Sequence, residues 1–303
     1  MIRKPNAVDV FLLVVLAAIW GSAFLAIKVA VPEFGPAWLV TVRVTLGFLV
    51  LLPWALWRGI IWPNSGRQWL LVATIALLNV IAPFFLISWA ELTIDAGVAS
   101  LLMGTGPFLA LIGSHFTTTD DRLNIWKLIA VVFGFAGVLT VIGVDAVQGL
   151  GSNLIAQGAA LAGSICYVVS GVLIRKVDGI PPMRFATIIL GISSLALLIG
   201  TSATVPLPAL PGSEAIFAVV WLGLLPTGSG YFLRYYLIRN VGYSFFALGL
   251  NLIPVFGVGL AALVLGEPIS AAVAIALALV VVGLGLARYG AAVRGPGKAR
   301  ATA

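Results

Sequence analysis

Long apolar runs alternate with short polar breaks along the whole chain, and the breaks are rich in proline, glycine and charge. They include VPEFGP, WPNSGR, TTTDDR, KVDGIPP and VPLPALPGS. Runs between such breaks approach the ~20 apolar residues that an α-helix needs to cross a hydrocarbon core about 30 Å thick. The pattern predicts ten transmembrane helices, over residues 7–31, 37–57, 67–89, 96–116, 124–143, 152–175, 183–204, 213–238, 243–265 and 269–290.

Composition extends this prediction to the whole molecule. Hydrophobic residues make up 61% of the chain, charged residues make up 9%, and the mean hydropathy is +1.16. A soluble globular domain is about a quarter charged, so the composition predicts an all-α integral membrane protein without a soluble domain. The first apolar run is longer than the roughly 7–15 residues of a signal-peptide core, and we expect it to be retained as a helix.

Basic residues set the predicted orientation, because short loops rich in Lys and Arg stay in the cytoplasm. With both termini in the cytoplasm, the inner loops receive most of the basic residues and the outer loops receive none. The outer loops then contain Glu33, Glu91, Asp95, Asp145, Glu214 and Glu267. The same bias explains the net charge of +7, so we expect no nucleic-acid partner.

The two halves of the chain resemble each other at a constant offset of 147 residues, which predicts an internal duplication. The offset aligns Trp20 with Tyr167, Lys28 with Arg175, Pro107 with Pro254, and Asp120 with Glu267. We expect a first repeat over residues 7–143, a second over 152–290, and a cytoplasmic tail over 291–303. Because five helices is an odd number, the second repeat is inverted in the membrane. Inverted repeats are typical of carriers, whose substrate sites lie at the repeat junction near the midplane.

Several stretches resemble the EamA branch of the drug/metabolite transporter superfamily. They are WGSAFLAIK, AGVASLLMGTGPFLALIG and YSFFALGLNLIPVFGVGLAALVLGEP. The family's most characteristic motif is present in the second half as Gly266-Glu267-Pro268, whereas the first half has Thr119-Asp120-Asp121. Within the family, the overall pattern and length are most similar to aromatic amino acid exporters of the YddG type. The resemblance implies ten helices, alternating access, and export of small metabolites across the bacterial inner (cell) membrane.

No carboxylate lies near the middle of a predicted span. A cationic-drug antiporter needs such a carboxylate to neutralise its cation, so that class is disfavoured. The obvious proton relay is also missing, and proton-coupled, exchange and facilitated transport all stay open. A neutral lumen suits a zwitterionic or neutral solute. The family resemblance implies that this solute is a zwitterionic amino acid, with a preference for aromatic side chains.

Polar and helix-breaking residues inside the spans are candidate site residues, because lipid alone does not favour them. Asn79 and Asn251, whose amides are costly against lipid, are predicted to bind substrate, as is Ser22. Gly21 allows close backbone approach beside Ser22 and is a predicted gating or helix-breaking position. Proline frees a carbonyl one turn earlier, which predicts a gating or helix-breaking role. The prolines in question are Pro83, Pro107, Pro226 and Pro254. The alternative for the prolines and glycines is kinking and close packing alone.

Side chains suited to stacking form a second group of candidates. Aromatic rings in a cavity would stack on a planar substrate and offer cation–π contacts to an ammonium group. Ordinary packing is the alternative for each of them. The predicted substrate-binding residues of this group are Trp20, Phe24, Phe84, Met103, Tyr167, Tyr231 and Phe246.

Two basic residues, Lys28 and Arg43, lie within the outer halves of predicted spans. Either would attract a substrate carboxylate near the outer mouth. The alternative is that they extend to the interface or pair with Glu33 or Glu91.

Other functional classes match the sequence less well. The single cysteine, Cys166, and single histidine, His115, supply no metal-ligand cluster, and we expect neither a metal nor another cofactor. Gly228-Ser229-Gly230 resembles the serine turn of intramembrane hydrolases, but the histidine lies at the inner end of another span. We therefore expect a transporter and not an enzyme. Nucleotide sugars, phosphorylated metabolites and drugs stay open as alternative substrates. The lipid bilayer is an expected partner, and a monomer is sufficient, with the oligomeric state left open.

Overall fold

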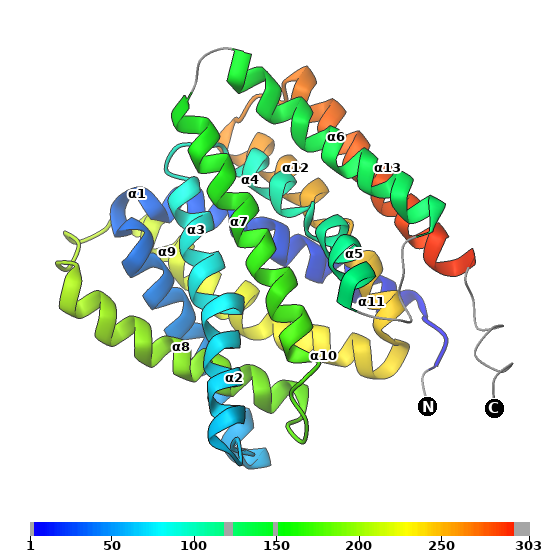
Figure 1. The fold of residues 1–303 in the computed structure, drawn as a ribbon. Helices are drawn as coiled ribbons and strands as arrows, with labels where there is room; N and C mark the ends of the chain where they lie inside the picture. The colour runs from blue at the N-terminus through cyan, green and yellow to red at the C-terminus, as the bar shows by residue number, and fades with distance from the viewer. Residues whose placement is uncertain (1–2, 118–123, 148–150, 294–303) are drawn as a thin grey trace, which may run out of the picture.

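The protein is described by a computed structural model over residues 3–117, 124–147 and 151–293, and every regular element in these ranges is a helix (Figure 1). The all-α prediction is confirmed for this part of the chain. Several predictions lie outside it: the motif Thr119-Asp120-Asp121, the pairing of Asp120 with Glu267, the tail beyond residue 293, and the side chains of His115 and Asp145.

The first element, α1 (Ala7–Arg58), contains the first two predicted spans. Gly35, flanked by prolines at 32 and 36, interrupts it with φ 66° and ψ 159°. Glycine adopts positive φ without a steric penalty, and proline cannot continue the hydrogen-bond ladder. The helix starts with a capping box in which Asn6 and Asp9 each accept a backbone N–H of the other. α1 therefore consists of two arms on either side of Gly35.

Shorter helices complete the first half of the chain. They are α2 (Gly66–Ala76), the π-helical η1 (Leu77–Ile81), α3 (Ala82–Ala90), α4 (Ala96–Met103), α5 (Gly106–Thr117) and α6 (Ile125–Val147). The second half contains α7 (Gly151–Ile174), α8 (Pro182–Thr204), α9 (Ser213–Leu222), the π-helical η2 (Gly223–Ser229), α10 (Gly230–Val241), α11 (Tyr243–Leu250), α12 (Ile253–Leu265) and α13 (Ala271–Val293).

Helix interruptions recur at the offset of 147 residues. η1, shifted by that offset, falls on residues 224–228, inside η2. The two residues between α4 and α5, 104–105, likewise fall on the two residues between α11 and α12, 251–252. π-Helical turns are rare and are found frequently at functional sites, so two of them at matching positions are not expected by chance. The duplication seen in the sequence therefore extends to the irregular backbone.

Six helical stretches within the described residues are long and apolar enough to cross a membrane. They are Ala7–Arg58, Gly66–Ala90, Asn153–Ile174, Pro182–Thr204, Ser213–Val241 and Ala271–Gly290. Shorter apolar helices cover Ala96–Ile112, Ile125–Val141 and Ile253–Leu265. By its length alone, Ala7–Arg58 contains more than one membrane thickness of helix, because 52 residues rise about 78 Å.

The main apolar core lies where α1 meets helices of the second half. α1 packs against α8, α9, η2 and α12. Glycines permit this approach: a Cβ at Gly21 would lie 2.6 Å from Phe256 Cβ, and a Cβ at Gly47 would lie 2.6 Å from Thr227 Cγ2. α6 and α13 run side by side along one edge of the molecule (Figure 1). Both pack against the buried ring of Phe108.

Candidate substrate site

Trp20 connects the first arm of α1 to the π-helical break of the second half. Its indole Nε1 donates a hydrogen bond to the Pro226 carbonyl at 3.1 Å. Its ring meets Phe246 of α11 edge to face, with centroids 5.9 Å apart. The polar end of this tryptophan is thus satisfied inside the protein by a carbonyl in a helix interruption. This contact explains a tryptophan in the middle of an apolar span.

One helical turn around Trp20 makes two further contacts between the halves. Ser22 is buried, and its hydroxyl donates to the Ile19 carbonyl and accepts from Trp221 Nε1 of α9 at 2.9 Å. Gly21 lies directly against α12, near Phe256. The Gly-Ser pair therefore brings α1 close to two helices of the second half.

Arg43, on the second arm of α1, is the most deeply placed cation of the predicted site, with 5% of its surface exposed. Its guanidinium carbon lies 3.8 Å from the centroid of the Phe84 ring, a close cation–π contact. Its Nε donates to Thr227 Oγ1 of η2 at 3.2 Å. Among the described residues this is its one hydrogen bond, although a guanidinium has five N–H donors.

Aromatic groups from both halves lie near this arginine, and Asn79 is linked to one of them through Ser170. Tyr167 of α7 and Tyr231 of α10 are close enough to interact electrostatically with Arg43. Asn79, in η1, donates from Nδ2 to Ser170 Oγ at 2.8 Å, and Ser170 in turn donates to the Tyr167 carbonyl. The matched π-helical turns thus supply Asn79 to one part of the cluster and Thr227 to another.

The remaining predicted residues lie elsewhere in the same core or at helix interruptions. Phe24 is buried beside Gly257 of α12 and serves packing there. Met103 ends α4 against the main core, and Asn251 lies in the turn between α11 and α12. Among the helix breakers, Pro226 lies within η2. Pro83 follows η1, while Pro107 and Pro254 lie at equivalent positions near the starts of α5 and α12.

The two basic residues expected near one mouth occupy different environments. Lys28 Nζ donates to the carbonyls of Glu91 at 2.9 Å and Ile94 at 2.7 Å, in the turn between α3 and α4. Arg43 instead lies with Phe84 and Thr227. The acceptors for Lys28 are main-chain oxygens, not the carboxylates that the sequence suggested as partners.

Sequence reasoning missed four polar residues that the structure brings into these contacts. Nothing in the sequence singled out Thr227, Ser170 or Trp221 within the predicted spans. Only Thr227 had a local indication, because the proline before it predicts irregular backbone. Glu91 was assigned to an outer loop and named as a possible partner of Lys28 or Arg43, but its burial was missed, because it is 1% exposed. Burial raises the pKa of this carboxyl well above its ordinary value.

The spaces between these helices are small. One is lined by apolar residues around Trp20 and Phe246, and another lies beside Asp95 and Glu267. Neither is large enough to hold a drug-sized ligand. The structure therefore describes a tightly packed arrangement at these two places.

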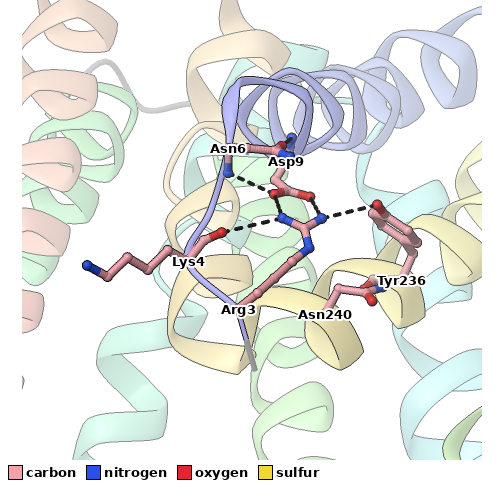
Figure 2. A network of polar contacts seen from close by, with 6 residues as sticks. All are labelled: Arg3, Lys4, Asn6, Asp9, Tyr236 and Asn240. Atoms are coloured by element: carbon pink, nitrogen blue, oxygen red, sulfur yellow. Dashed lines mark hydrogen bonds and ion pairs between the residues drawn. The ribbon is translucent and has the colours of Figure 1, made fainter. Parts of the chain in front are cut away.

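A polar network joins the N-terminal segment to α10 at one end of α1 (Figure 2). Arg3 forms an ion pair with Asp9, and its guanidinium also donates to the Tyr236 hydroxyl at 3.4 Å. The Arg3 backbone N–H donates to the Asn240 carbonyl at 2.9 Å. The hydrogen bond with Asp9 raises the pKa of Arg3, which stays charged. Lys28 lies about 28 Å further along the same arm than Asp9, and its contacts with the α3–α4 turn stay within the first half.

Apolar helices of membrane-spanning length, a repeated pattern of helix interruptions, and a buried polar cluster between the two halves define a membrane transporter. The chain belongs to the EamA-like transporter family, whose model matches residues 8–143 and again residues 154–289. The EamA unit is therefore present twice, and the protein is a transporter rather than an enzyme.

Relatives in several organisms are also named as transporters. The chain is 28% identical to the uncharacterized transporter YdfC of Bacillus subtilis, covering 83% of this chain and 81% of the relative. It is 28% identical to a probable terminal-alkyne amino-acid exporter of Streptantibioticus cattleyicolor, covering 85% and 86%. It is 27% identical to the uncharacterized inner membrane transporter YedA of Escherichia coli, covering 84% and 82%.

A solved crystal structure has the same fold. It superposes with a TM-score of 0.68 at 21% sequence identity, covering 93% of this chain and 98% of the other. At that level of identity the likeness concerns the fold alone.

Proposed function

We propose that this protein exports small zwitterionic amino acids, with a preference for aromatic side chains, from the cytoplasm across the bacterial inner membrane. Ten spans in two inverted repeats, residues 7–143 and 152–290, would alternate between access from each side, with both termini in the cytoplasm. The naming of one relative as an inner membrane transporter supports the location. The naming of another as a probable amino-acid exporter supports the substrate class.

The observation that carries the proposal is the partly used guanidinium of Arg43. It is buried between the halves, it stacks over Phe84, and its single hydrogen bond among described residues goes to Thr227. Arginine binds carboxylates through two parallel N–H donors, and four of its donors are free of described partners. A substrate carboxylate fits this role better than a cation does.

Aromatic groups near the arginine support the preference for aromatic side chains. Phe84, Tyr167 and Tyr231 come from three different helices around the same guanidinium. Trp20 and Phe246 form a second ring pair. A planar substrate side chain would gain stacking contacts among them, worth about 0.5–1.5 kcal/mol per ring pair beyond area burial.

A second substrate class is favoured by one observation. Arg234, on α10, lies 6.0 Å from the Tyr231 ring and 5.7 Å from the Phe246 ring, so a second cation is near the same aromatic groups. Two arginines near one site suit a phosphorylated metabolite or a nucleotide sugar, because phosphate favours bidentate arginine contacts.

Transport into proteoliposomes separates these possibilities. Labelled phenylalanine, threonine and a nucleotide sugar are offered to the wild type and to Arg43→Gln, Arg43→Lys and Arg239→Gln. Arg239 is a matched control, because its guanidinium also lies near a ring, Tyr235, at 5.9 Å, but on an exposed surface. We expect phenylalanine flux in the wild type and the control.

Arg43→Gln should remove a charge-assisted hydrogen bond to the substrate, which is worth about 1.5–3 kcal/mol. This loss corresponds to a fall in kcat/KM of roughly ten- to hundredfold. Arg43→Lys would retain charge but lose the fork geometry, and its flux should be intermediate. Absence of phenylalanine flux in the folded protein refutes the aromatic preference. Flux of the nucleotide sugar alone would establish the second class instead.

A further inference from the structure

Glu91 is a buried carboxylate at the turn between α3 and α4. It is 1% exposed, and neither of its carboxylate oxygens has a hydrogen-bond partner among the described residues. A charged carboxylate in such a place costs several kcal/mol, and the group normally takes up a proton instead. Asp9, which is equally buried, differs because Arg3 forms an ion pair with it.

The charges around Glu91 do not stabilise its ionised form strongly. Lys28 of α1 is close, but its ammonium donates to the carbonyls of Glu91 and Ile94 rather than to the carboxylate. Glu267, which follows α12, is a second carboxylate, and its charge disfavours ionisation of Glu91. Its oxygens accept the N–H groups of Ala96 and Gly97 at 2.9 Å each, at the start of α4.

The charges of Lys28 and Glu267 have opposite effects on the ionisation of Glu91. Lys28 and, more weakly, Arg43 favour the carboxylate, and Glu267 favours the neutral acid. α4 contributes no titratable side chain, and α7, which packs against α3, contributes Cys166 and Tyr167. Burial is the largest influence, and it raises the pKa of Glu91 well above the ordinary value of a glutamic acid.

The local oxygen atoms favour a proton over a metal cation. A sodium or calcium ion needs several oxygen ligands, and main-chain carbonyls are usual donors. The two carbonyls nearest to this role, those of Glu91 and Ile94, already bind the Lys28 ammonium. The described residues also contain no cluster of three or more His, Cys, Asp or Glu residues with metal-binding geometry.

We propose that Glu91 is a proton-binding site, which is protonated in the packed arrangement seen here and becomes ionised when the α3–α4 turn is opened to water. On opening, the carboxylic acid releases one proton to water and becomes a carboxylate, and on closing it takes one proton back. Because the proton is bound more tightly in the packed arrangement, that arrangement is stabilised at low pH and weakened as the pH rises through the raised pKa. Opening would then be a pH-dependent step of transport, and this last consequence alone rests on the proposed function.

Infrared difference spectroscopy tests the site without any substrate. The full-length protein is placed in nanodiscs, and the C=O stretch of protonated carboxylic acids is followed from acidic to alkaline pH. The chain has only ten Asp and Glu residues, so few bands compete. Glu91→Gln is compared with Glu214→Gln, an exposed carboxylate in the first turn of α9.

We expect a carboxylic acid band at neutral pH in the wild type and in Glu214→Gln, and its loss in Glu91→Gln. Glu91→Asp should keep a band at a shifted frequency. That shift would assign the band to residue 91 even if Glu91→Gln does not fold. A wild type without the band at neutral pH, or a band unaffected by either change at Glu91, overturns the proposal. A band that sodium removes at constant pH also overturns it, in favour of a cation site.

Exchange of labelled phenylalanine across proteoliposomes measures the consequence for transport. The wild-type rate should rise with pH, and the rate of Glu91→Gln should lose that dependence. A band that depends on Glu91 with no phenylalanine exchange would refute the proposed substrate and leave the proton site established. Exchange with the same pH dependence in Glu91→Gln would refute the gating role.

Discussion

The contact between Glu267 and α4 provides a quantitative test of how the two halves are held together. Glu267 lies in the Gly-Glu-Pro motif of the second half and accepts the N–H groups of Ala96 and Gly97 in the first half. These are orphan donors at the start of a helix, where a negative charge is also favoured. The perturbation is Glu267→Gln, which retains the size of the side chain but removes the charge and one acceptor.

The magnitude follows from two charge-assisted hydrogen bonds. Each contributes about 1.5–3 kcal/mol, and Gln retains one neutral bond of about 1 kcal/mol. A loss of about 2 kcal/mol is a lower estimate, and it corresponds to about a 30-fold increase in local opening. The larger change, Glu267→Ala, removes both acceptors and should exceed this value.

Hydrogen exchange followed by mass spectrometry measures this opening directly, because amide protection reports the free energy of local opening. Peptides covering residues 91–105 should exchange about 30-fold faster in Glu267→Gln at the same pH. Glu214→Gln, with an exposed carboxylate, should leave them unchanged. Exchange in Glu267→Gln within about twofold of the wild type would refute the view that this contact holds the halves together.

Two further predictions concern α1. Gly21→Val should clash with Phe256, because a Cβ there would lie 2.6 Å from Phe256 Cβ, and overpacking of this kind costs about 1–3 kcal/mol. The thermal unfolding midpoint should fall, whereas Gly259→Ala on α12, with nothing within 4 Å of the added Cβ, should not lower it; equal midpoints would contradict the close packing. Trp20→Phe retains an aromatic ring against Phe246 but removes the hydrogen bond to the Pro226 carbonyl, worth about 1 kcal/mol. Phenylalanine transport should slow by about fivefold, and an unchanged rate and KM would remove Trp20 from the site.

Polar contacts between the two halves lie near both ends of the first arm of α1. At one end, Arg3 reaches Tyr236 and Asn240 of α10 (Figure 2). At the other, Glu267 reaches the start of α4 beside Lys28. Between these ends, Trp20 and Ser22 contact η2 and α9. Transport by alternating access requires one set of end contacts to break while the other holds, so these contacts are natural sites for mutations that bias the conformation.

The helical class and the duplication could be predicted from the sequence, because each produces a regular pattern along the chain. Apolar runs of bilayer length arise from the requirement that every backbone polar group be satisfied inside lipid. The same offset of 147 residues relates irregular backbone that the sequence did not predict, since η1 falls within η2. The family model matches the chain twice, over residues 8–143 and 154–289, so the repeated unit itself is shown.

The environment of single polar residues was not readable in this way. Arg43 and Lys28 look alike in an apolar run, yet one lies over Phe84 and the other binds carbonyls in a turn. Both the hydrogen bond from Trp20 and that from Asn79 depend on helices more than 90 residues away in the chain. No local pattern encodes such partners.

The sequence by itself determined that the chain is helical, belongs in a membrane, and is built from two related halves, because these properties follow from hydropathy, length and repetition. Only the tertiary structure decided which polar groups are satisfied and which are left without partners. Glu91 illustrates the difference: the sequence placed it in an outer loop as a possible ion-pair partner, but the folded chain buries it without a hydrogen bond to its carboxylate among the described residues. The cost of burying a charge depends on neighbours from distant segments, and only the folded chain brings those neighbours together.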